Sequence, residues 1–312
     1  MKDTTSPDSR NGFADLSTFP SPLLTNLIDE YIDSLRWSNY SQNTVRGYRH
    51  DLLHFLKHQE DEENFTLEDF TADALTSYFS SLAVAPTTLA RRQSTFSSFC
   101  NWLRKNSYIT INPLDKIQRV KLPEKLPKAK TKSELAKLFS VMKQRKDEYG
   151  KRDYALFLLL YQSGLRVSEA LSLRISDVNF QNQTIRLFGK GQVESIIPFS
   201  TQTKNALRAY LRIRRDKTDK SYLFLSYRKG KLGYRQVYTL LKEYAKQAGI
   251  KDITPHSLRH SFCTHLLASG RNLREIQQLA RHKSIQSTVR YLSLSDEQTI
   301  KAYRQSEDRL EV

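Results

Sequence analysis

The C-terminal half of this 312-residue chain carries the side-chain types that phosphodiester transfer through a covalent tyrosyl intermediate needs. The transition state at phosphorus carries extra negative charge on its non-bridging oxygens, and a fixed guanidinium offers it two parallel N–H donors. A tyrosine phenol, whose reference pKa is about 10, becomes a useful nucleophile near neutral pH only where nearby positive charge lowers that pKa. A lysine or histidine can then protonate the departing sugar oxygen. The candidate residues are Arg166, Lys190, His256, Arg259, His282 and Tyr291.

Two local strings carry a family resemblance. The segment SGLRVSEALSL contains Arg166 and, one helical turn later, Glu169. The segment HSLRHSFCTHLL contains the H-x-x-R pattern of His256 and Arg259. Both resemble the sequence boxes of the tyrosine recombinase/integrase family, which includes phage integrase-like and Xer-type site-specific recombinases. An isolated H-x-x-R on a helix is more often surface or core filler, so the prediction rests on the joint match in order, spacing and local sequence.

The last two candidate residues also fit this resemblance. Tyr291 lies nine residues after His282, and the nucleophile of the family likewise lies near the C-terminus. One position departs from the family pattern, because Arg281 stands where the family usually has glycine before the second histidine. The longer, charged side chain of Arg281 could reach a DNA phosphate or a partner subunit, or it could displace His282.

The resemblance implies a role for each residue around the phosphate. Arg166 and Arg259 would hold the scissile phosphate and stabilise the charge that develops on it. His282 would donate a hydrogen bond to the same phosphate. Glu169 would orient Arg166 or His256 without touching the DNA.

The resemblance also implies the covalent step and its proton transfers. Lys190 would protonate the 5′-oxygen, and His256 would assist proton transfer to or from the phenol of Tyr291. Tyr291 would form a 3′-phosphotyrosyl bond that retains the energy for rejoining, so no ATP is needed, and the cationic side chains would do the work of a metal ion. Four protomers on two DNA sites would exchange strands through a Holliday junction.

The charge distribution predicts a polyanionic partner. The net charge is +17, and it is uneven. Residues 1–90 hold 6 Lys and Arg against 14 Asp and Glu, a net of −8, whereas residues 91–312 hold 44 against 19, a net of +25. A positive field of this size attracts nucleic acid and makes the binding steeply salt-dependent.

The remaining composition is typical of a globular protein of a reducing compartment. Hydrophobic residues make up 38% of the chain, and no apolar run approaches the roughly 20 residues that a membrane span needs. Residues 1–20 read as a flexible polar tail without a hydrophobic signal core. Cys100 and Cys263 are expected to be packed free thiols. We therefore expect a cytoplasmic, nucleoid-associated protein.

Residues 21–105 are predicted to form a helical, SAM-like core-binding domain. Apolar residues recur there at helical spacing in four segments, 23–35, 41–56, 67–82 and 87–103. In the family, a small helical domain of this size clamps one face of the duplex. Because the first 90 residues are acidic overall, only selected faces are expected to touch DNA. The candidate contacts there are Arg46, Arg49, Arg91 and Arg92.

Residues 106–130 are predicted to be a basic linker. Prolines and basic residues interrupt any helical periodicity in this stretch. A strap along the phosphate backbone and a solvated hinge are both compatible with this composition. Its candidate DNA contacts are Lys121, Lys125, Lys128 and Lys130, and Arg281 adds one from the following domain.

Residues 131–312 are predicted to form an α+β catalytic domain. The segment 177–200 alternates apolar and polar residues between turn signals, which predicts a three-stranded antiparallel meander with Lys190 at its second tip. Helical patterns cover 131–146, 151–162, 203–215, 234–248, 257–269, 273–280 and 285–292. The expected fold is mainly α with this small β-meander, and the resemblance implies that the two domains form a C-shaped DNA clamp.

The resemblance also implies partners. These are double-stranded DNA with inverted-repeat core sites and further copies of the chain, as a dimer on each site and a homotetramer in all. The segment after Tyr291 would either pack into a neighbouring protomer in a cyclic arrangement or pack on its own domain. A second recombinase or an accessory protein is a possible further partner, and a membrane is not expected.

One further residue pattern and two rival functions are compatible with parts of the sequence. His50, His54 and His58 recur every four residues, as metal-binding pairs do, but no cysteine or matched carboxylate completes a site, so an exposed polar face or a phosphate contact is expected. The rival functions are a type IB topoisomerase and a DNA-binding protein that has lost catalysis. Within the recombinases, both resolution of replicon dimers and movement of a mobile element are compatible with the sequence.

Overall fold

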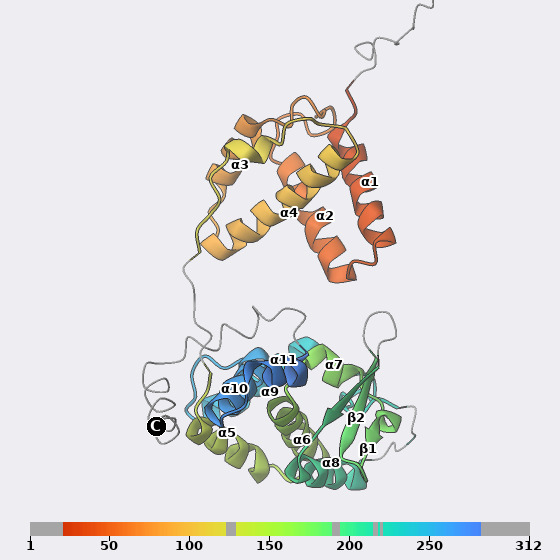
Figure 1. Cartoon of the computed structure of the whole chain (residues 1–312), viewed down its shortest axis with the longest axis vertical. Coiled ribbons are helices and arrows are strands. Elements are labelled where there is room, and N and C mark those ends of the chain that lie inside the picture. Colours follow the sequence, from red (N-terminus) through yellow and green to blue (C-terminus); the bar gives the residue numbers. More distant parts are fainter. Residues whose placement is uncertain (1–20, 123–128, 189–193, 215–217, 219–220, 282–312) are drawn as a thin grey trace, which may run out of the picture. The chain divides into compact units, whose positions relative to one another are not determined.

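The computed structural model describes residues 21–122, 129–188, 194–214, 218 and 221–281, and the chain forms two compact units, Met1–Glu124 and Lys125–Val312 (Figure 1). Each unit has a hydrophobic core of its own. Because each unit buries its own apolar surface, the two are separate domains in the physical sense.

Four helices enclose the core of the first unit. Their buried faces are rich in aromatic residues, and the ring of Phe55 packs edge-on against four neighbouring rings with centroid separations of 5.2 to 5.6 Å. Such edge-to-face contacts add to the free energy gained by burial. The helices are α1 (Leu24–Trp37), α2 (Gln42–Leu56), α3 (Ala72–Ser81) and α4 (Pro86–Lys105).

Helix α3 begins later than its apolar pattern predicts. The predicted start at residue 67 falls in a turn where the Asp69 carboxylate accepts a hydrogen bond from the Thr66 amide at 2.8 Å. The side chain of Thr71 then caps the helix by accepting from the Ala74 amide at 3.2 Å. A Thr N-cap of this kind fixes the first turn more strongly than the preceding apolar residues extend it.

The first part of the predicted linker is packed on the first unit. It contains a short 3₁₀ helix, η2 (Pro113–Lys116), and its residues Ile109, Leu114 and Ile117 lie against the core. The Gln93 side chain fixes the next residues, because it donates to the Gln118 carbonyl and accepts from the Val120 amide. This segment is therefore ordered, although the irregular spacing of its apolar residues gives no helical pattern in the sequence.

The second unit is built around helix α6 (Glu148–Ser163), which is buried between α5, α8 and α10. Its residues 155–160 are at most 1% exposed, as expected of a helical segment whose consecutive residues are all apolar. The other helices are α5 (Lys132–Gln144), α7 (Val167–Ser172), η3 (Ile175–Asp177), α8 (Thr201–Ile213), α9 (Tyr234–Gln247), α10 (Pro255–Ala268) and α11 (Leu273–Ala280).

A three-stranded antiparallel sheet in the order β1-β2-β3 covers one side of this helical core. Its strands are β1 (Val178–Asn179), β2 (Thr184–Phe188) and β3 (Glu194–Pro198). Ile185 pairs with Ile197, and both side chains are buried in the core. The predicted fold class, mainly helical with one small antiparallel meander, is confirmed; the tip of the second hairpin lies outside the described residues.

Candidate active site

The first arginine of the site is placed by the end of helix α6. Gly164 closes this helix in the left-handed conformation, with φ 59° and ψ 26°. A Cβ atom built on Gly164 would lie 2.4 Å from Cδ1 of Phe262 on α10, so only glycine fits both the backbone and the space. The chain turns here and starts α7, and Arg166 becomes the residue that precedes its first turn.

Arg166 and Glu169 form a compact pair on α7. The Glu169 carboxylate accepts from the Arg166 amide and from its guanidinium Nη1, both at 2.8 Å. The Arg166 side chain keeps 46% of its surface exposed. Burial alone would raise the pKa of Glu169, but the amide hydrogen bond of Arg166 and the charge of Arg281 lower it on balance, so the carboxylate is ionised near neutral pH.

The second arginine, Arg259 on α10, is only 3% exposed. Its Nη1 donates to the Gly164 carbonyl, and its Nη2 donates to the Ala280 carbonyl at the end of α11. Burial, and then the positive charges of Arg166 and Arg281, lower the pKa of Arg259 to about 10, which leaves it charged at neutral pH. Two main-chain carbonyls thus hold a buried guanidinium in one orientation.

Arg281 completes this arrangement from α11. It ends the helix in the left-handed conformation, with φ 54° and ψ 47°. Its carbonyl accepts a hydrogen bond from Nη2 of Arg166 at 3.4 Å, and its own Nη2 donates to Glu169 at 2.6 Å. Figure 1 shows the ends of α7, α10 and α11 close together, as these contacts require.

His256 lies in the first turn of α10, three residues before Arg259. The turn is fixed by Thr254, whose side chain accepts from the Ser257 amide at 3.2 Å, and by Pro255 in the first helical position. Partial burial, together with the charges of Arg259 and Arg166, lowers the pKa of His256. The imidazole is therefore neutral at pH 7 and able to accept a proton.

Of the predicted catalytic and orienting residues, the structure brings together Arg166, Glu169 and Arg259, and His256 lies on α10 three residues before Arg259. Lys190, His282 and Tyr291 lie outside the described residues. The sequence did not single out the carbonyls of Gly164 and Ala280, because a main-chain acceptor has no signature in the residue type. The glycine in SGLR was the one available signal.

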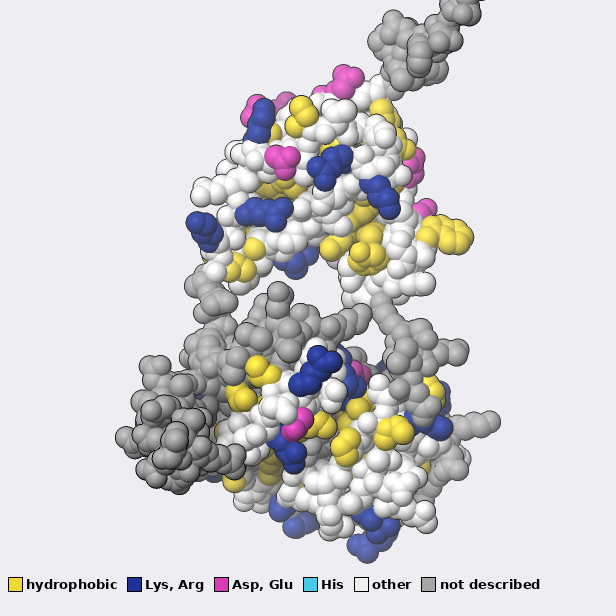
Figure 2. All heavy atoms as spheres, viewed as in Figure 1, with side chains coloured by type: hydrophobic (Ala, Val, Ile, Leu, Met, Phe, Trp, Pro, Cys, Tyr) yellow, Lys and Arg dark blue, Asp and Glu magenta, His cyan; other side chains and the backbone are white. Residues whose placement is uncertain are grey.

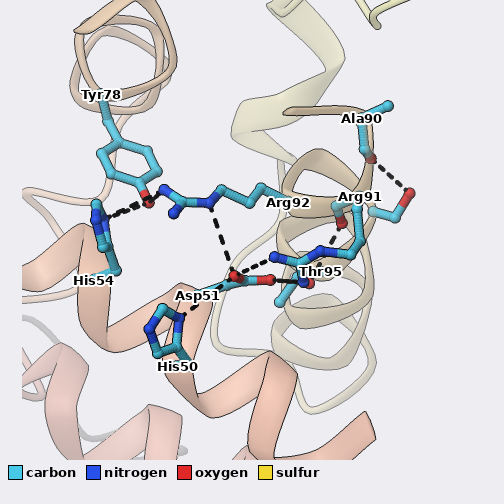
Figure 3. A network of polar contacts seen from close by, with 9 residues as sticks. His50, Asp51, His54, Tyr78, Ala90, Arg91, Arg92 and Thr95 are labelled. Atoms are coloured by element: carbon cyan, nitrogen blue, oxygen red, sulfur yellow. Dashed lines mark hydrogen bonds and ion pairs between the residues drawn. The ribbon is translucent and has the colours of Figure 1, made fainter. Parts of the chain in front are cut away.

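In the first unit, the basic residues predicted to contact DNA differ in their surroundings. Arg91 reaches across to α2 and pairs with the buried carboxylate of Asp51, with Nη2 at 2.8 Å from Oδ1, while its side chain stays 52% exposed (Figure 3). Arg92 was expected to point away from the buried face of α4, and the structure contradicts this. It is 8% exposed and donates to the Tyr78 hydroxyl at 2.8 Å.

Asp51 explains why Arg92 turns inward. Its carboxylate is fully buried and also accepts from the Thr95 hydroxyl at 2.9 Å. A buried carboxylate needs compensating charge, and Arg92 brings its Nε to 3.8 Å from it (Figure 3). The signal was present in the sequence, since Asp51 interrupts the apolar stripe of α2.

The other two arginines of this unit that were predicted to contact DNA are exposed. Arg49 pairs with Asp29 at 3.1 Å, and among the described residues Arg46 has no ion pair within the chain. His54 of α2 and His58, which lies two residues beyond the end of this helix, have polar partners inside the unit. Nδ1 of His54 lies 3.0 Å from the Tyr78 hydroxyl, and Nε2 of His58 lies 2.7 Å from the Ser81 hydroxyl.

The candidate DNA-contact lysines of the predicted linker also differ in their exposure to solvent. Lys121 is exposed, and Lys125 and Lys128 lie outside the described residues. Lys130 is 8% exposed, and its Nζ donates to the Lys251 carbonyl at 2.6 Å. Its amide also donates to the Ser261 hydroxyl at 2.8 Å, so in this structure Lys130 attaches the start of the second unit to α10.

Surface charge and hydropathy complete the description of the two units. Lys and Arg side chains are distributed over the face of both units that Figure 2 shows. No helix within the described part of the chain is long and apolar enough to cross a membrane. Cys100 and Cys263 are both buried, as predicted.

Comparison with known proteins decides the family. The phage integrase family matches residues 129–298, and the phage integrase N-terminal SAM-like domain matches residues 28–107. The chain belongs to the phage integrase family of tyrosine recombinases. The sequence-based prediction of a tyrosine-type site-specific recombinase is thereby confirmed.

Curated members of this family are similar over nearly the whole chain. Tyrosine recombinase XerC of Corynebacterium glutamicum is 32% identical over 296 residues, which cover 93% of this chain and 94% of that protein. Tyrosine recombinase XerC of Herpetosiphon aurantiacus is 34% identical over 274 residues, which cover 86% and 89% of the two chains.

Solved structures show the same fold. The XerA recombinase is 26% identical with a TM-score of 0.53, and the match covers 91% of this chain and 98% of that one. The XerH recombinase bound to a palindromic difH substrate is 21% identical with a TM-score of 0.71, covering 90% and 84%. The recombinase fold therefore extends over both units of this chain.

Proposed function

We propose that this recombinase cuts and rejoins DNA with Tyr291 as nucleophile and with Arg166 and Arg259 as the phosphate-binding pair. The observation that carries the proposal is the convergence of both guanidiniums on the last carbonyls of α11, immediately before His282. Two fixed arginines beside an ionised carboxylate form a preorganised anion site, which stabilises the negative charge of a phosphoryl transition state.

The proposed proton transfers divide between a base and an acid. His256 is neutral at pH 7 and can accept the phenolic proton as Tyr291 attacks phosphorus. Lys190, placed by the sequence between two glycines after β2, would protonate the 5′-oxygen that leaves. The phosphotyrosyl bond conserves the energy of the broken phosphodiester, so rejoining needs no nucleotide, and the reaction as proposed uses no metal ion.

The proposed partner is double-stranded DNA with inverted-repeat core sites. The net charge of +25 on residues 91–312 supports this, as do the XerH and Tn1549 transposon integrase structures, both solved with DNA. In the first unit Arg46, Arg49 and Arg91 are exposed enough to contact phosphates, whereas Arg92 would first have to leave Tyr78. Two dimers would assemble as a tetramer through the segment after Tyr291.

Covalent capture tests the proposal directly. The protein is incubated with fragmented DNA from its own source, denatured in SDS, and the linked DNA ends are sequenced, with Tyr291→Phe in parallel. We expect adducts that cluster at one sequence and vanish in Tyr291→Phe. Scattered adducts would instead indicate relaxation of the topoisomerase kind, and tight DNA binding without adducts from the wild type would refute the proposal.

The captured sequence also distinguishes the two biological roles. One site per replicon, near the region where replication ends, would indicate resolution of chromosome or plasmid dimers. Sites at both ends of a discrete segment would indicate integration and excision of a mobile element. Relaxed and supercoiled plasmids that carry the captured site would then show whether recombination needs a second recombinase or an accessory protein.

A further inference from the structure

Arg281 occupies a backbone position that disfavours its side chain. It closes α11 with φ 54° and ψ 47°, a left-handed conformation in which a Cβ atom crowds the following carbonyl. Glycine is the usual residue at such a helix end. An arginine therefore does not stabilise the backbone at this position, and any benefit of the residue must come from the contacts of its side chain.

The side chain of Arg281 closes a ring with the first phosphate-binding arginine. Its Nη2 donates to Oε2 of Glu169 at 2.6 Å, and Oε1 of the same carboxylate accepts from Nη1 of Arg166 at 2.8 Å. Nη2 of Arg166 then donates to the Arg281 carbonyl at 3.4 Å. The Arg281 side chain is 15% exposed and that of Glu169 is 23% exposed, so the contact between them is partly shielded from solvent.

This ring affects the charge as well as the orientation of Arg166. A carboxylate paired with one arginine neutralises it, whereas a carboxylate shared by two arginines leaves the group with one net positive charge. Arg166 keeps 46% of its side-chain surface exposed, so its remaining N–H donors stay available to a ligand. Arg281 itself has its other terminal nitrogen on the Leu279 carbonyl at 3.2 Å.

We propose that Arg281 is a positioning residue, which holds Glu169 between two guanidiniums and so fixes the orientation and preserves the charge of Arg166. The inference rests on the proposed function, because Arg166 matters only if it binds the scissile phosphate. It differs from a direct phosphate contact by Arg281, which would require its guanidinium to leave both Glu169 and the Leu279 carbonyl.

Two substitutions with the same backbone preference provide the test. Arg281→Asn removes the guanidinium but keeps a residue that tolerates the left-handed conformation. Lys229→Asn is the matched control, because Lys229 has φ 59°, lies in the same unit, and loses the same charge in the substitution. The unfolding temperature of each variant, measured beside its rate, separates a loss of activity from damage to the fold.

The readout is single-turnover formation of the covalent adduct on a nicked duplex that carries the captured site. We expect Arg281→Asn to slow this step by roughly tenfold to a hundredfold, as for a misplaced reacting group. The dissociation constant for the duplex and its salt dependence should stay unchanged. Lys229→Asn should react at the wild-type rate, and Arg281→Lys should recover part of the lost rate because it can still pair with Glu169.

A double-mutant cycle shows whether Arg281 acts through Glu169. If it does, adding Glu169→Gln to Arg281→Asn should slow the reaction no further than the slower single variant. If the rate reductions of the two single variants multiply in the double variant, the inference is overturned. An unchanged rate in Arg281→Asn would also overturn it, and so would weaker binding with a salt dependence reduced by about one phosphate contact, since the latter indicates direct contact with DNA.

The failure of the inference and that of the proposed function are distinguishable. If the wild type forms no adduct at all, the proposed function fails and the role of Arg281 in it fails too. If the wild type and Arg281→Asn form the adduct equally fast, only the inference fails. A cycle on the free energy of unfolding gives a check without DNA, because additive effects of Arg281→Asn and Glu169→Gln would show that the two side chains are not coupled.

Discussion

Arg259 is held as a charged group in an almost fully buried place, and main-chain carbonyls rather than a carboxylate hold it. A carboxylate partner would neutralise the guanidinium, whereas the two carbonyls orient it and leave its full charge for a ligand. The planar fork of arginine suits two acceptors that approach from different helices. Glu169 has a similar effect on Arg166. Its carboxylate orients the Arg166 guanidinium but shares its negative charge with Arg281, so Arg166 is not fully neutralised.

Arg259→Lys should therefore impair both stability and catalysis. A lysine ammonium cannot reach both the Gly164 and Ala280 carbonyls in the geometry of the fork, and an unsatisfied buried acceptor costs about 1–3 kcal/mol. Loss of a preorganised donor to the transition state should slow adduct formation by about 10²–10³-fold. Urea unfolding and single-turnover rates measure the two effects. Arg271→Lys, in an exposed pair with Glu275, should change neither.

His256 predicts the shape of the pH profile. Partial burial and the charges of Arg259 and Arg166 lower its pKa, so adduct formation should fall on the acid side with a midpoint below about 6.5, the usual value for histidine. Stability should also fall on the acid side. Because the unfolded chain binds the proton more readily, the His256 contribution to the free energy of unfolding is lost as the pH falls below about 6.5. His256→Gln should abolish both acid-side changes, and an unaltered profile would contradict this.

At the scale of elements, the site depends on how three helices end. Gly164 follows the last residue of α6, Arg281 follows the last residue of α11, and Arg166 precedes the first residue of α7, so backbone groups left unpaired at helix ends are used to hold side chains. Phe262 of α10 lies against the α carbon of Gly164 and fixes the distance between α6 and α10.

Gly164→Ala tests this contact, and Gly249→Ala is its matched control. Both glycines have positive φ, 59° and 69°, but a Cβ on Gly249 would meet no atom within 4 Å. The control Gly249→Ala should lower the free energy of unfolding by about 1 kcal/mol, because glycine adopts a positive φ more readily than alanine. Gly164→Ala should lose a further 1–3 kcal/mol or so from overpacking against Phe262. Equal losses of free energy of unfolding would show that the close approach is unimportant.

The sequence predicted most elements but not the contacts between their ends. Apolar periodicity located most of the described helices and the meander, because burial on one face leaves a repeating pattern, whereas the predicted helix at 285–292 lies outside the described residues. It placed the start of α3 too early, since Leu67 and Phe70 continue the pattern through a turn. The residues of the two catalytic strings were predictable by resemblance. Their carbonyl partners were not, because a main-chain group has the same chemistry whatever residue carries it.

At the scale of the whole molecule, charge is distributed unevenly along the chain, and the two units have separate cores. The acidic excess lies in residues 1–90 and the basic excess in the remainder, so long-range attraction to DNA is expected to come mainly from residues 91–312. Within the first unit, Asp51 neutralises charge that would otherwise be available, since it binds Arg91 and lies near Arg92. The polar network around Asp51 therefore stabilises the first unit.

Asp51→Asn tests whether the two units are stabilised separately. The substitution removes the charge that compensates Arg91 and the buried Arg92, and breaking a buried pair in this way typically costs about 3–5 kcal/mol. Since the contacts of Asp51 within the described part of the chain are all with side chains of the first unit, the loss should be confined to that unit. Hydrogen exchange followed by mass spectrometry, resolved by peptide, should show faster exchange in α2, α3 and α4 and unchanged protection in α6 and α10. Asp33→Asn, which breaks an exposed pair with Arg36, should leave both units unaffected. Faster exchange in α6 as well would mean that the second unit depends on the first for its stability, and the separate cores would then not imply separate folding.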